Sequence, residues 1–433
     1  MEAGGINMKR EKNALFFFIF TLLITILFSV NINAQWVPTE QLPSGGGIGG
    51  IYSLASSGAN VFAGTYSNGV FLNTNNGTSW DKKSSGLPTN SIIQSLIVVG
   101  SNIFAGTHGG GVFLTTNNGS SWTEVNSDLP DTIVYSFAVS GSNIFAGTEG
   151  GIFLSTNNGS SWTEADEGIF SPTFHSSVPA LAVSPNGTGG SNIFAASFVY
   201  IFLSSDNGTT WTKKSSGLPN SLIQCLIAVG SNIFAGTSSE GVYLSTDNGE
   251  SWNEMNDGLT SKKIWSFAAS GTNLFAGTED GVFVTTNLGS NWEGTEYNYL
   301  SAWTLTISEM QLFSGGGLGR VYKRPLSEMI TDVENLSDIL PSDFYLEQNY
   351  PNPFNPTTKI KYSIPSSNHF VTLRIHDVLG REVATLVNED KQPGFYEVEF
   401  NGSNFNSGIY FYSIEVNNNT ETYKNVKKMI LLK

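Results

Sequence analysis

The sequence predicts an all-β protein in which a seven-bladed β-propeller precedes a β-sandwich, and two repeated signals carry this prediction. The first is the tetrapeptide Phe-Ala-Gly-Thr or a degraded copy of it, beginning at Phe62, Phe104, Phe145, Phe194, Phe234, Phe275 and Phe313. The second is a hairpin of the form Ser/Thr/Asn-x-Asp/Asn-x-Gly-x-x-Trp, which ends at Trp80, Trp122, Trp162, Trp211, Trp252 and Trp292. A period of about 41 residues with room for four short strands is typical of a propeller blade.

Composition narrows the class of protein and of ligand. The 433 residues are 39% apolar and include 47 glycines, which favours a large core joined by many turns. The net charge of −15 argues against binding to nucleic acid or to an anionic membrane, because both need clustered Lys and Arg. A cation, or a neutral glycan or peptide, suits this surface better. The single cysteine, Cys225, excludes an internal disulfide, and we interpret it as a small core residue.

The N-terminus resembles a secretory signal peptide. Lys9, Arg10 and Lys12 precede an apolar run at 14–30, and a segment that looks cleavable follows at 32–34. We therefore predict a signal peptide over residues 1–34. The apolar run is long, so an uncleaved membrane anchor is the alternative.

Residues 35–325 form the predicted propeller, and its first strand closes the ring. The segment around Trp36 matches the last strand of a repeat whose earlier strands are missing, whereas the seventh repeat, 303–324, lacks that last strand. The N-terminal strand should therefore complete the final blade, which removes the exposed sheet edges of an open array. We expect a monomer.

Each repeat predicts four strands, which the second copy places at 94–99, 102–107, 111–116 and from 122 onward. Asn117-Asn-Gly119 before the last strand is a tight hairpin signal. The fourth repeat departs from the others, because it has insertions at 169–178 and 185–190. Insertions of this kind map to loops on one face of a repeat protein, which is often the binding face.

After a predicted linker at 326–340, a second module occupies 341–433. Short alternating runs follow one another and are separated by turn residues, at 359–364, 371–376, 396–400, 408–416 and 424–432. About 90 residues of such strands predict an Ig-like β-sandwich.

The tryptophan hairpins resemble the Asp-box (BNR) repeats of sialidases, sortilin-type receptors, xyloglucanases and a photosystem assembly factor. The third position of the box and its tryptophan are the pairs Asn75 and Trp80, Asn117 and Trp122, Asn157 and Trp162, Asp206 and Trp211, Asp247 and Trp252, and Asn287 and Trp292. Asn supports the same turn as Asp, so we interpret these residues as structural. In that family the boxes lie away from the ligand face.

The C-terminal module resembles the type A sorting domain of the type IX secretion system of Bacteroidetes-like bacteria. The carriers of the resemblance are the segments 350–356 (Tyr-Pro-Asn-Pro-Phe-Asn-Pro), 377–381 (Asp-Val-Leu-Gly-Arg), 407–411 (Ser-Gly-Ile-Tyr-Phe) and 427–433 (Lys-Lys-Met-Ile-Leu-Leu-Lys). The resemblance implies the type IX secretion machinery as a partner and export to the cell surface or the medium.

Catalysis has few candidate residues. A sialidase needs an arginine triad for its substrate carboxylate, but residues 35–325 contain only Arg320 and Arg324. A glycosidase needs two carboxylates about 5–9.5 Å apart. The turns after the second strands place the candidate acids on one face, and these are Glu149, Glu240, Glu279 and Asp280. We favour the interpretation that they are solvated loop acids, and a catalytic pair is the alternative.

Candidate ligand contacts on the same face are Tyr66, His108, Asp131, His175 and Arg320. Trp265 and Trp303 are either stacking platforms or core residues. His108 and His175 are the propeller's only histidines, so we predict no metal site and no cofactor.

The sequence thus favours an exported, non-enzymatic module that binds a glycan, peptide or protein on the loop-bearing face of the propeller. A carbohydrate-active hydrolase of the xyloglucanase or sialidase-like kind is the alternative. The near-identity of the blades favours the first hypothesis, since catalytic propellers usually break their repeat where the chemistry is placed.

Overall fold

The computed structural model describes residues 35–43, 49–169, 177–186, 190–296, 301–330, 344–364, 369–391, 394–417 and 422–432. The predicted signal peptide, most of the predicted linker and His175 lie outside the described residues. Within the described part of the chain, no helix is long and apolar enough to cross a membrane.

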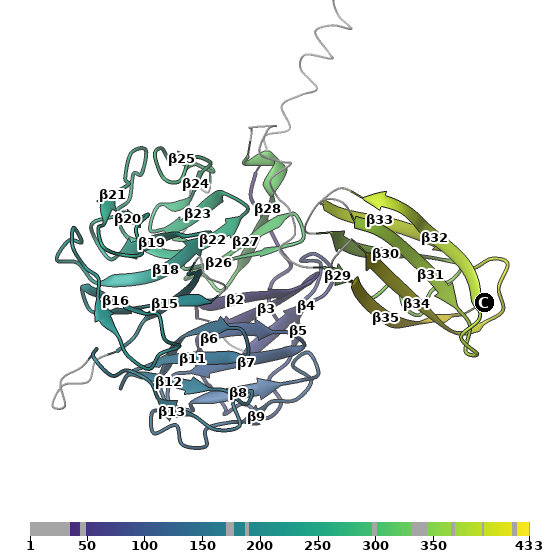
Figure 1. The fold of residues 1–433 in the computed structure, drawn as a ribbon, viewed down its shortest axis with the longest axis horizontal. Helices are drawn as coiled ribbons and strands as arrows, with labels where there is room; N and C mark the ends of the chain where they lie inside the picture. Colours follow the sequence, from purple (N-terminus) through teal and green to yellow (C-terminus); the bar gives the residue numbers. More distant parts are fainter. Residues whose placement is uncertain are drawn as a thin grey trace, which may run out of the picture.

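Seven four-stranded antiparallel sheets form the blades of a propeller (Figure 1). Blade 1 comprises β2 (Ile51–Ser57), β3 (Asn60–Thr65), β4 (Val70–Asn73) and β5 (Asp81–Lys82). Blade 2 comprises β6 (Ile93–Val99), β7 (Asn102–Thr107), β8 (Val112–Thr115) and β9 (Thr123–Glu124). Blade 3 comprises β10 (Val134–Ser140), β11 (Asn143–Thr148), β12 (Ile152–Ser155) and β13 (Thr163–Glu164).

The next three blades repeat this order. Blade 4 comprises β14 (Ala180–Pro185), β15 (Ser191–Ser197), β16 (Tyr200–Ser204) and β17 (Thr212–Lys213). Blade 5 comprises β18 (Ile223–Val229), β19 (Asn232–Thr237), β20 (Val242–Ser245) and β21 (Asn253–Glu254). Blade 6 comprises β22 (Ile264–Ser270), β23 (Asn273–Thr278), β24 (Gly281–Thr285) and β25 (Glu293–Gly294).

Blade 7 joins the two ends of the propeller, as predicted. Its strands are β26 (Thr304–Ser308), β27 (Gln311–Gly315), β28 (Val321–Pro325) and, on the outside, β1 (Val37–Pro38). Val37 pairs with Lys323 on β28, so the N-terminal strand completes the last sheet. The indole N–H of Trp36 donates to the carbonyl of Thr295 in blade 6 at 3.1 Å. Because Trp36 bonds to the preceding blade, it takes the place of the tryptophan that the seventh repeat lacks.

The hydrophobic core lies between blades rather than within one sheet. Each second strand contributes alternating buried residues to clusters shared with the next blade; Phe62 of blade 1, for example, packs with Ile103 and Trp122 of blade 2. Both faces of the middle strands are therefore covered, which explains why segments such as Val112-Phe-Leu114 are apolar at successive positions. The 3-10 helix η1 (Leu326–Glu328) follows β28, and Leu326 is buried against blades 6 and 7.

The C-terminal module is a sandwich of two antiparallel sheets. One sheet has the order β29-β30-β33 and the other β32-β31-β34-β35. Their bounds are β29 (Tyr345–Leu346), β30 (Thr357–Ile364), β31 (His369–His376), β32 (Glu382–Lys391), β33 (Gly394–Asn401), β34 (Gly408–Asn417) and β35 (Thr422–Leu431). Strand β32 was not among the predicted runs. Lys361 of β30 forms an ion pair of 2.6 Å with Glu309 in the turn between β26 and β27.

Candidate functional site: the loop face of the propeller

Up-and-down strands give the propeller two faces with different turns. The turns between second and third strands and the connections between blades share one face, which we call the loop face. The turns between first and second strands share the opposite face with the six tryptophan hairpins, and we call it the hairpin face. The first strands of neighbouring blades contact one another and so lie innermost.

On the loop face, five of the seven first strands begin with a β-bulge. In blades 1, 2, 3, 5 and 6 the register between first and second strands shifts by one residue at this end. The extra residue is Tyr52, Gln94, Tyr135, Gln224 or Trp265. A bulge leaves one residue outside the ladder and re-aims its side chain, and bulges are enriched next to functional sites. With Trp303, which directly precedes β26, these five residues form what we call the inner ring.

The glycine of Phe-Ala-Gly-Thr makes room for the bulge. The glycine pairs with the residue that follows the bulge, which is Ser95 in blade 2. A Cβ on Gly106 would overlap Ser95 Oγ and the Val134 side chain of blade 3. Ser95 Oγ in turn donates to the carbonyl of Val134 at 3.4 Å, which links the two blades. Blade 4 has no bulge, and there the glycine is replaced by Ala196. All five bulged blades have the glycine, whereas blade 7 keeps Gly315 without a register shift, so the glycine permits the bulge but does not require it.

A second ring surrounds the first. The residue directly after each second strand projects from the loop face, and we call this set the outer ring; its members are Tyr66, His108, Glu149, Phe198, Ser238, Glu279 and Gly316. These residues share one position of the repeat, but they range from aromatic to acidic to small. Their variety contrasts with the near-constant Phe-Ala-Gly-Thr strand that carries them.

Aromatic side chains from blades 6, 7 and 1 meet across the two rings. The ring centroids of Tyr52 and Tyr66 are 5.7 Å apart, those of Tyr52 and Trp303 5.5 Å, and those of Trp265 and Trp303 6.2 Å. Gly49 and Gly50 allow this approach, since a Cβ on either would overlap Tyr66 or Trp303. Lys263 Nζ lies 4.4 Å from the centroid of the Trp265 ring. We call Tyr52, Tyr66, Trp265 and Trp303 the aromatic quartet.

Trp265 carries an unmet donor within the quartet. Its indole N–H is buried and has no hydrogen-bond partner among the residues the structure describes. A buried donor without an acceptor costs about 1–3 kcal/mol. Trp265 therefore combines an apolar surface with an unused donor.

Blade 3 adds a carboxylate to the same surface. Tyr135 of the inner ring donates its hydroxyl to Glu149 Oε2 at 2.6 Å. Burial, together with this bond to Glu149, raises the pKa of Tyr135 to about 12, so the phenol stays protonated at neutral pH. Asp131 lies close by, where its Oδ2 accepts a hydrogen bond of 3.2 Å from Thr148. The tyrosine holds Glu149 in place at the edge of the inner ring.

The other predicted acids are spread around the rim. Glu240 belongs to blade 5 and Glu279 and Asp280 to blade 6, and all three are exposed. Asp280 accepts a hydrogen bond of 3.0 Å from Thr260. In the part of the chain that the structure describes, no hydrogen bond links Glu149 to Glu240, Glu279 or Asp280, and no group of three or more His, Cys, Asp or Glu is arranged to hold a metal ion.

The two arginines of the propeller differ in role. Arg320 is exposed on the turn between β27 and β28, on the loop face, and it stays a candidate ligand contact together with the exposed His108. Arg324 is buried, and its guanidinium donates to the carbonyl of Thr295 and lies 3.6 Å from Glu328. It holds the end of blade 7 against blade 6. Burial also raises the pKa of the Cys225 thiol, which disfavours the nucleophilic thiolate.

On the hairpin face, the six tryptophan hairpins repeat one hydrogen-bond pattern. In the hairpin of blade 3, the Ser155 hydroxyl donates to Asn157 Oδ1 at 2.9 Å and accepts the Gly159 N–H at 2.8 Å. Asn157 Oδ1 also accepts the Ser161 N–H at 2.9 Å. The Trp162 indole reaches the preceding blade and donates to the Val125 carbonyl at 2.8 Å. These atoms bond to their own chain, which accords with a structural role.

The inner ring was largely missed by sequence reasoning, although a signal for it exists. Five first strands share the pattern Ile/Val-x-Ser/Cys-Leu/Phe, in which x is the bulged residue; these segments are 51–54, 93–96, 134–137, 223–226 and 264–267. Only Trp265 and Trp303 were singled out from composition. A large residue, always Tyr, Gln or Trp, inside an otherwise constant strand start could have identified Tyr52 and Tyr135 as well.

The motifs of the C-terminal module lie close together at one end of its sheets. Phe354, in the proline-rich segment, donates its N–H to Ile430 at 2.9 Å, and Leu432 donates to Phe354 at 2.9 Å, so the segment 350–356 is bonded to the last strand. In the turn after β31, Asp377 Oδ2 accepts the Arg381 Nε–H at 2.7 Å, and this bond lowers the pKa of Asp377.

Comparison with protein families finds a match within each module. Residues 348–430 match the secretion system C-terminal sorting domain. The sandwich is a type IX sorting domain. The protein is therefore secreted or attached to the outer surface, and its C-terminal domain implies interaction with the type IX secretion machinery. Residues 49–182 match the DUF6242 β-propeller domain, which covers blades 1 to 3 and the start of blade 4. No protein of curated function matches the sequence.

Solved structures show the same propeller fold at low sequence identity. YCF48 bound to D1 peptide is 16% identical with a TM-score of 0.54, and the match covers 68% of this chain and 98% of that one. YCF48 from Cyanidioschyzon merolae is 14% identical with a TM-score of 0.53, covering 67% and 99%. The extracellular domain of a hybrid two-component system from B. thetaiotaomicron is 13% identical with a TM-score of 0.55, and 92% of this chain covers 59% of that one.

Proposed function

We propose that this protein is an exported, non-enzymatic recognition module of the Asp-box type, whose loop face binds a glycan, peptide or protein segment. The observation that carries the proposal is the pair of rings. A strand repeated almost unchanged presents side chains of several kinds at these positions, with Tyr, Gln or Trp in the inner ring and Tyr, His, Glu, Phe, Ser or Gly in the outer ring. Variable contacts on a constant scaffold suit recognition, because the scaffold keeps its fold while the contacts change.

The aromatic quartet is the central contact in this proposal. Its four rings offer flat apolar surface beside the Tyr66 hydroxyl. Such a surface takes either the C–H face of a sugar ring or an apolar side chain of a peptide. The charge of −15 favours an uncharged or cationic ligand here. The peptide carried by YCF48, which has a similar fold, makes a peptide one reasonable class.

The test is an array screen of the full chain on glycans and on peptides, with hydrolysis assays on the same sugars. We expect binding without turnover. For the best ligand, Tyr66→Ala should weaken affinity about 10-fold, since aromatic stacking is worth about 0.5–1.5 kcal/mol beyond its buried area. Tyr66 is 47% exposed, so its removal should leave the fold intact. Val37→Ala, at a similarly exposed apolar residue of the outermost strand, is the matched control.

Other outcomes separate the alternatives. Turnover of a glycan would replace recognition by a carbohydrate-active hydrolase, and the acids Glu149, Glu240, Glu279 and Asp280 would then be changed singly to amides. Activity that survives all four changes would remove these acids as candidates. Equal binding by wild type, Tyr66→Ala and a Trp265→Ala variant would place the ligand elsewhere. No binding on either the glycan array or the peptide array would point to a folded protein partner.

A further inference from the structure

A pocket on the loop face of blade 4 has an imperfect duplicate in blade 1. The heptapeptide Lys-Lys-Ser-Ser-Gly-Leu-Pro begins at the last residue of the fourth strand in both blades, at 82–88 and 213–219. In each blade it encloses a cavity against the start of the third strand, of about 410 Å³ in blade 1 and about 530 Å³ in blade 4. Two pockets built from one heptapeptide allow a comparison within the molecule.

The two pockets differ in the residue directly before the equivalent positions Val70 and Ile201. In blade 1 it is Gly69, whose φ is +74° and where a Cβ would overlap Ser84. In blade 4 the turn is one residue shorter, and Phe198 takes the positive φ of 54° instead. This leaves the residue before Ile201 free to carry a side chain, and that residue is Tyr200. The departure of the fourth repeat thus adds an aromatic wall to a pocket that otherwise has none.

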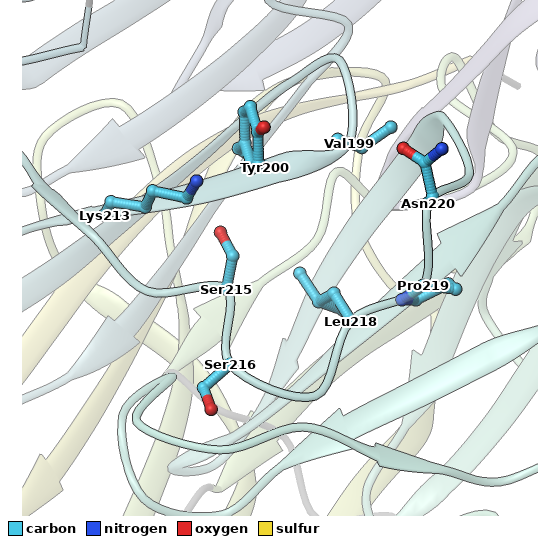
Figure 2. A pocket seen from close by; sticks show the side chains of 8 residues that line it. All are labelled: Val199, Tyr200, Lys213, Ser215, Ser216, Leu218, Pro219 and Asn220. Atoms are coloured by element: carbon cyan, nitrogen blue, oxygen red, sulfur yellow. The ribbon is translucent and has the colours of Figure 1, made fainter.

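A lysine ammonium group lies against this aromatic wall. Lys213 Nζ lies 3.3 Å from the centroid of the Tyr200 ring, and Figure 2 shows the two side chains approaching each other along one edge of the pocket. Among the described residues Lys213 forms no ion pair. The lining residues are Val199, Tyr200, Lys213, Ser215, Ser216, Leu218, Pro219 and Asn220, and none of them is acidic. In a chain with a net charge of −15, this pocket is a local exception.

Some polar groups of the pocket bond to the protein itself, and others are exposed to a ligand. Ser215 Oγ accepts the Ile201 N–H at 2.9 Å and donates to the Ile201 carbonyl at 3.1 Å, so it holds the pocket together. Ser216 and Asn220 are exposed and offer a hydroxyl and an amide. Figure 2 places Leu218 and Pro219 at the end of the pocket away from Lys213. The pocket therefore presents one cation, one aromatic ring, an apolar end and two neutral polar groups.

We propose that this pocket binds an acidic saccharide unit, that is, a sugar ring bearing a carboxylate. The carboxylate accepts hydrogen bonds from the Lys213 ammonium, and the C–H face of the sugar replaces the ammonium on the Tyr200 ring. The exchange is favourable because a charge-assisted hydrogen bond is roughly twice as strong as a neutral one. Ser216 and Asn220 then bond to the sugar hydroxyls. Neither inorganic phosphate nor a peptide carboxylate would use the aromatic wall in this way.

This inference deepens the proposed recognition function and rests on it for the ligand's role, but the pocket is a site separate from the aromatic quartet. Phe198 of the outer ring lies two residues before Tyr200 and is 47% exposed, which extends the apolar surface from the pocket toward the rings. A polymer with one acidic unit in the pocket has this surface along which to continue.

The experiment compares two probes that differ only in charge. Trigalacturonate and its methyl ester, which is neutral, are titrated into the full chain at low ionic strength, and the dissociation constants are measured by calorimetry. Wild type should bind the acid about 10-fold more tightly than the ester. Lys213→Gln should remove this preference, whereas Tyr200→Ser should weaken both probes. Thermal unfolding of each variant checks that the fold is retained.

Blade 1 supplies the matched control. Lys82→Gln removes the equivalent lysine from the pocket that lacks the aromatic wall, so it should leave both dissociation constants unchanged. An equal loss in Lys82→Gln and Lys213→Gln would mean that net charge alone attracts the acid, and the proposal would be wrong. Equal affinity for acid and ester in wild type would also overturn it, as would no binding of either probe at millimolar concentration.

Two further arms separate this site from its alternatives. Inorganic phosphate that displaces the acid at comparable concentration would show a plain anion site and overturn the saccharide assignment. Tyr66→Ala should leave the preference for acid over ester intact, because Tyr66 belongs to blade 1 and to the aromatic quartet and does not line the blade 4 pocket. If the array screen finds no ligand for the quartet while Lys213 still discriminates the probes, the recognition function of the rings fails and the pocket stands.

Discussion

The hairpin face and the loop face are built from the same repeats, yet their residues vary in opposite ways. On the hairpin face, Ser155, Asn157 and Trp162 have counterparts of nearly the same chemistry in every hairpin, and the counterparts make corresponding bonds. On the loop face, the outer ring places tyrosine, histidine, glutamate, phenylalanine and serine at one position of the repeat. The difference follows from what the side chains touch.

Hairpin-face residues join blades, whereas ring residues project from them. Each tryptophan donates to a backbone carbonyl or hydroxyl of the preceding blade, as Trp162 does to Val125 and Trp122 to Lys83. Losing one such contact would open the joint between two blades. Among the described residues, no hydrogen bond joins the side chain of Tyr66 or Glu149 to a neighbouring blade, so the fold leaves their identity open. A repeat protein can thus vary its binding surface without changing its joints.

The comparison predicts its largest effect at Trp162. Trp162 is 1% exposed, and its replacement by alanine leaves a large cavity between blades 2 and 3. We expect Trp162→Ala to lower the free energy of unfolding by about 3–5 kcal/mol, and Tyr66→Ala on the opposite face to change it by less than about 0.5 kcal/mol. Denaturation in guanidinium chloride measures both. Equal losses in the two variants would show that both faces contribute equally to the free energy of unfolding, which would contradict the comparison.

A smaller effect is expected where the fold aims the inner ring. Gly106→Ala sets a methyl group against Ser95 and Val134, at the point where the bulge turns out Gln94. We expect a loss of about 1–3 kcal/mol, as for other overpacked sites. Ala196→Gly is the matched change in blade 4, which has no bulge, and it should cost only about 0.5–1 kcal/mol through backbone entropy. Thermal unfolding compares the two.

A Gly106→Ala variant as stable as wild type would indicate that the first strand of blade 2 can lose its bulge without cost. The inner ring would then be an accident of packing rather than a built feature. The double variant Gly106→Ala with Ser95→Gly sharpens the test, because it removes the side chain nearest the new methyl group. It should recover part of the lost stability.

The architecture could be predicted because its signals are long-range and repeated. Seven copies of one strand fixed the number of blades, and the displaced Trp36 revealed how the ring closes before any pairing was known. The bulges could not be predicted in the same way, since a shift of one residue depends on how Ser95 packs beneath Gly106 and the next blade. Strand β32 escaped because it is mostly exposed, which removes the alternation of apolar residues that identifies a strand.

The candidate site was located by face but not by residue. The sequence placed Tyr66, Glu149 and Asp280 on one face through the order of the strands, and each is exposed there. It could not tell that Tyr66 meets Tyr52 or that Glu149 bonds to Tyr135, because these partners lie on first strands whose register only the bulge sets. Topology assigns a residue to a face, whereas packing assigns its neighbours.

The smallest effect should come from changing Asp to Asn within a hairpin. Asp247 accepts the Ser251 N–H at 3.0 Å and the Ser251 hydroxyl at 2.5 Å, whereas Asn157 accepts the equivalent N–H and donates to the Ser161 hydroxyl at 2.9 Å. The hydroxyl reverses its role, so both residues satisfy the turn. Asp247→Asn should change the free energy of unfolding by less than about 0.5 kcal/mol at pH 7, whereas Asp247→Ala should cost about 1 kcal/mol.

The pH dependence distinguishes the two side chains. The hydrogen bonds from Ser251 lower the pKa of Asp247 in the folded protein below its unfolded value. Its contribution to stability is therefore present above the unfolded pKa, at about pH 4, and is lost as the pH falls through the folded pKa. Wild type should lose slightly more stability than Asp247→Asn between about pH 5 and about pH 3, roughly one unit either side of that value. A large loss of stability in Asp247→Asn at pH 7 would mean that the hairpin needs the negative charge itself. The near-constant residues of the hairpin face could then not be explained by contacts between blades alone.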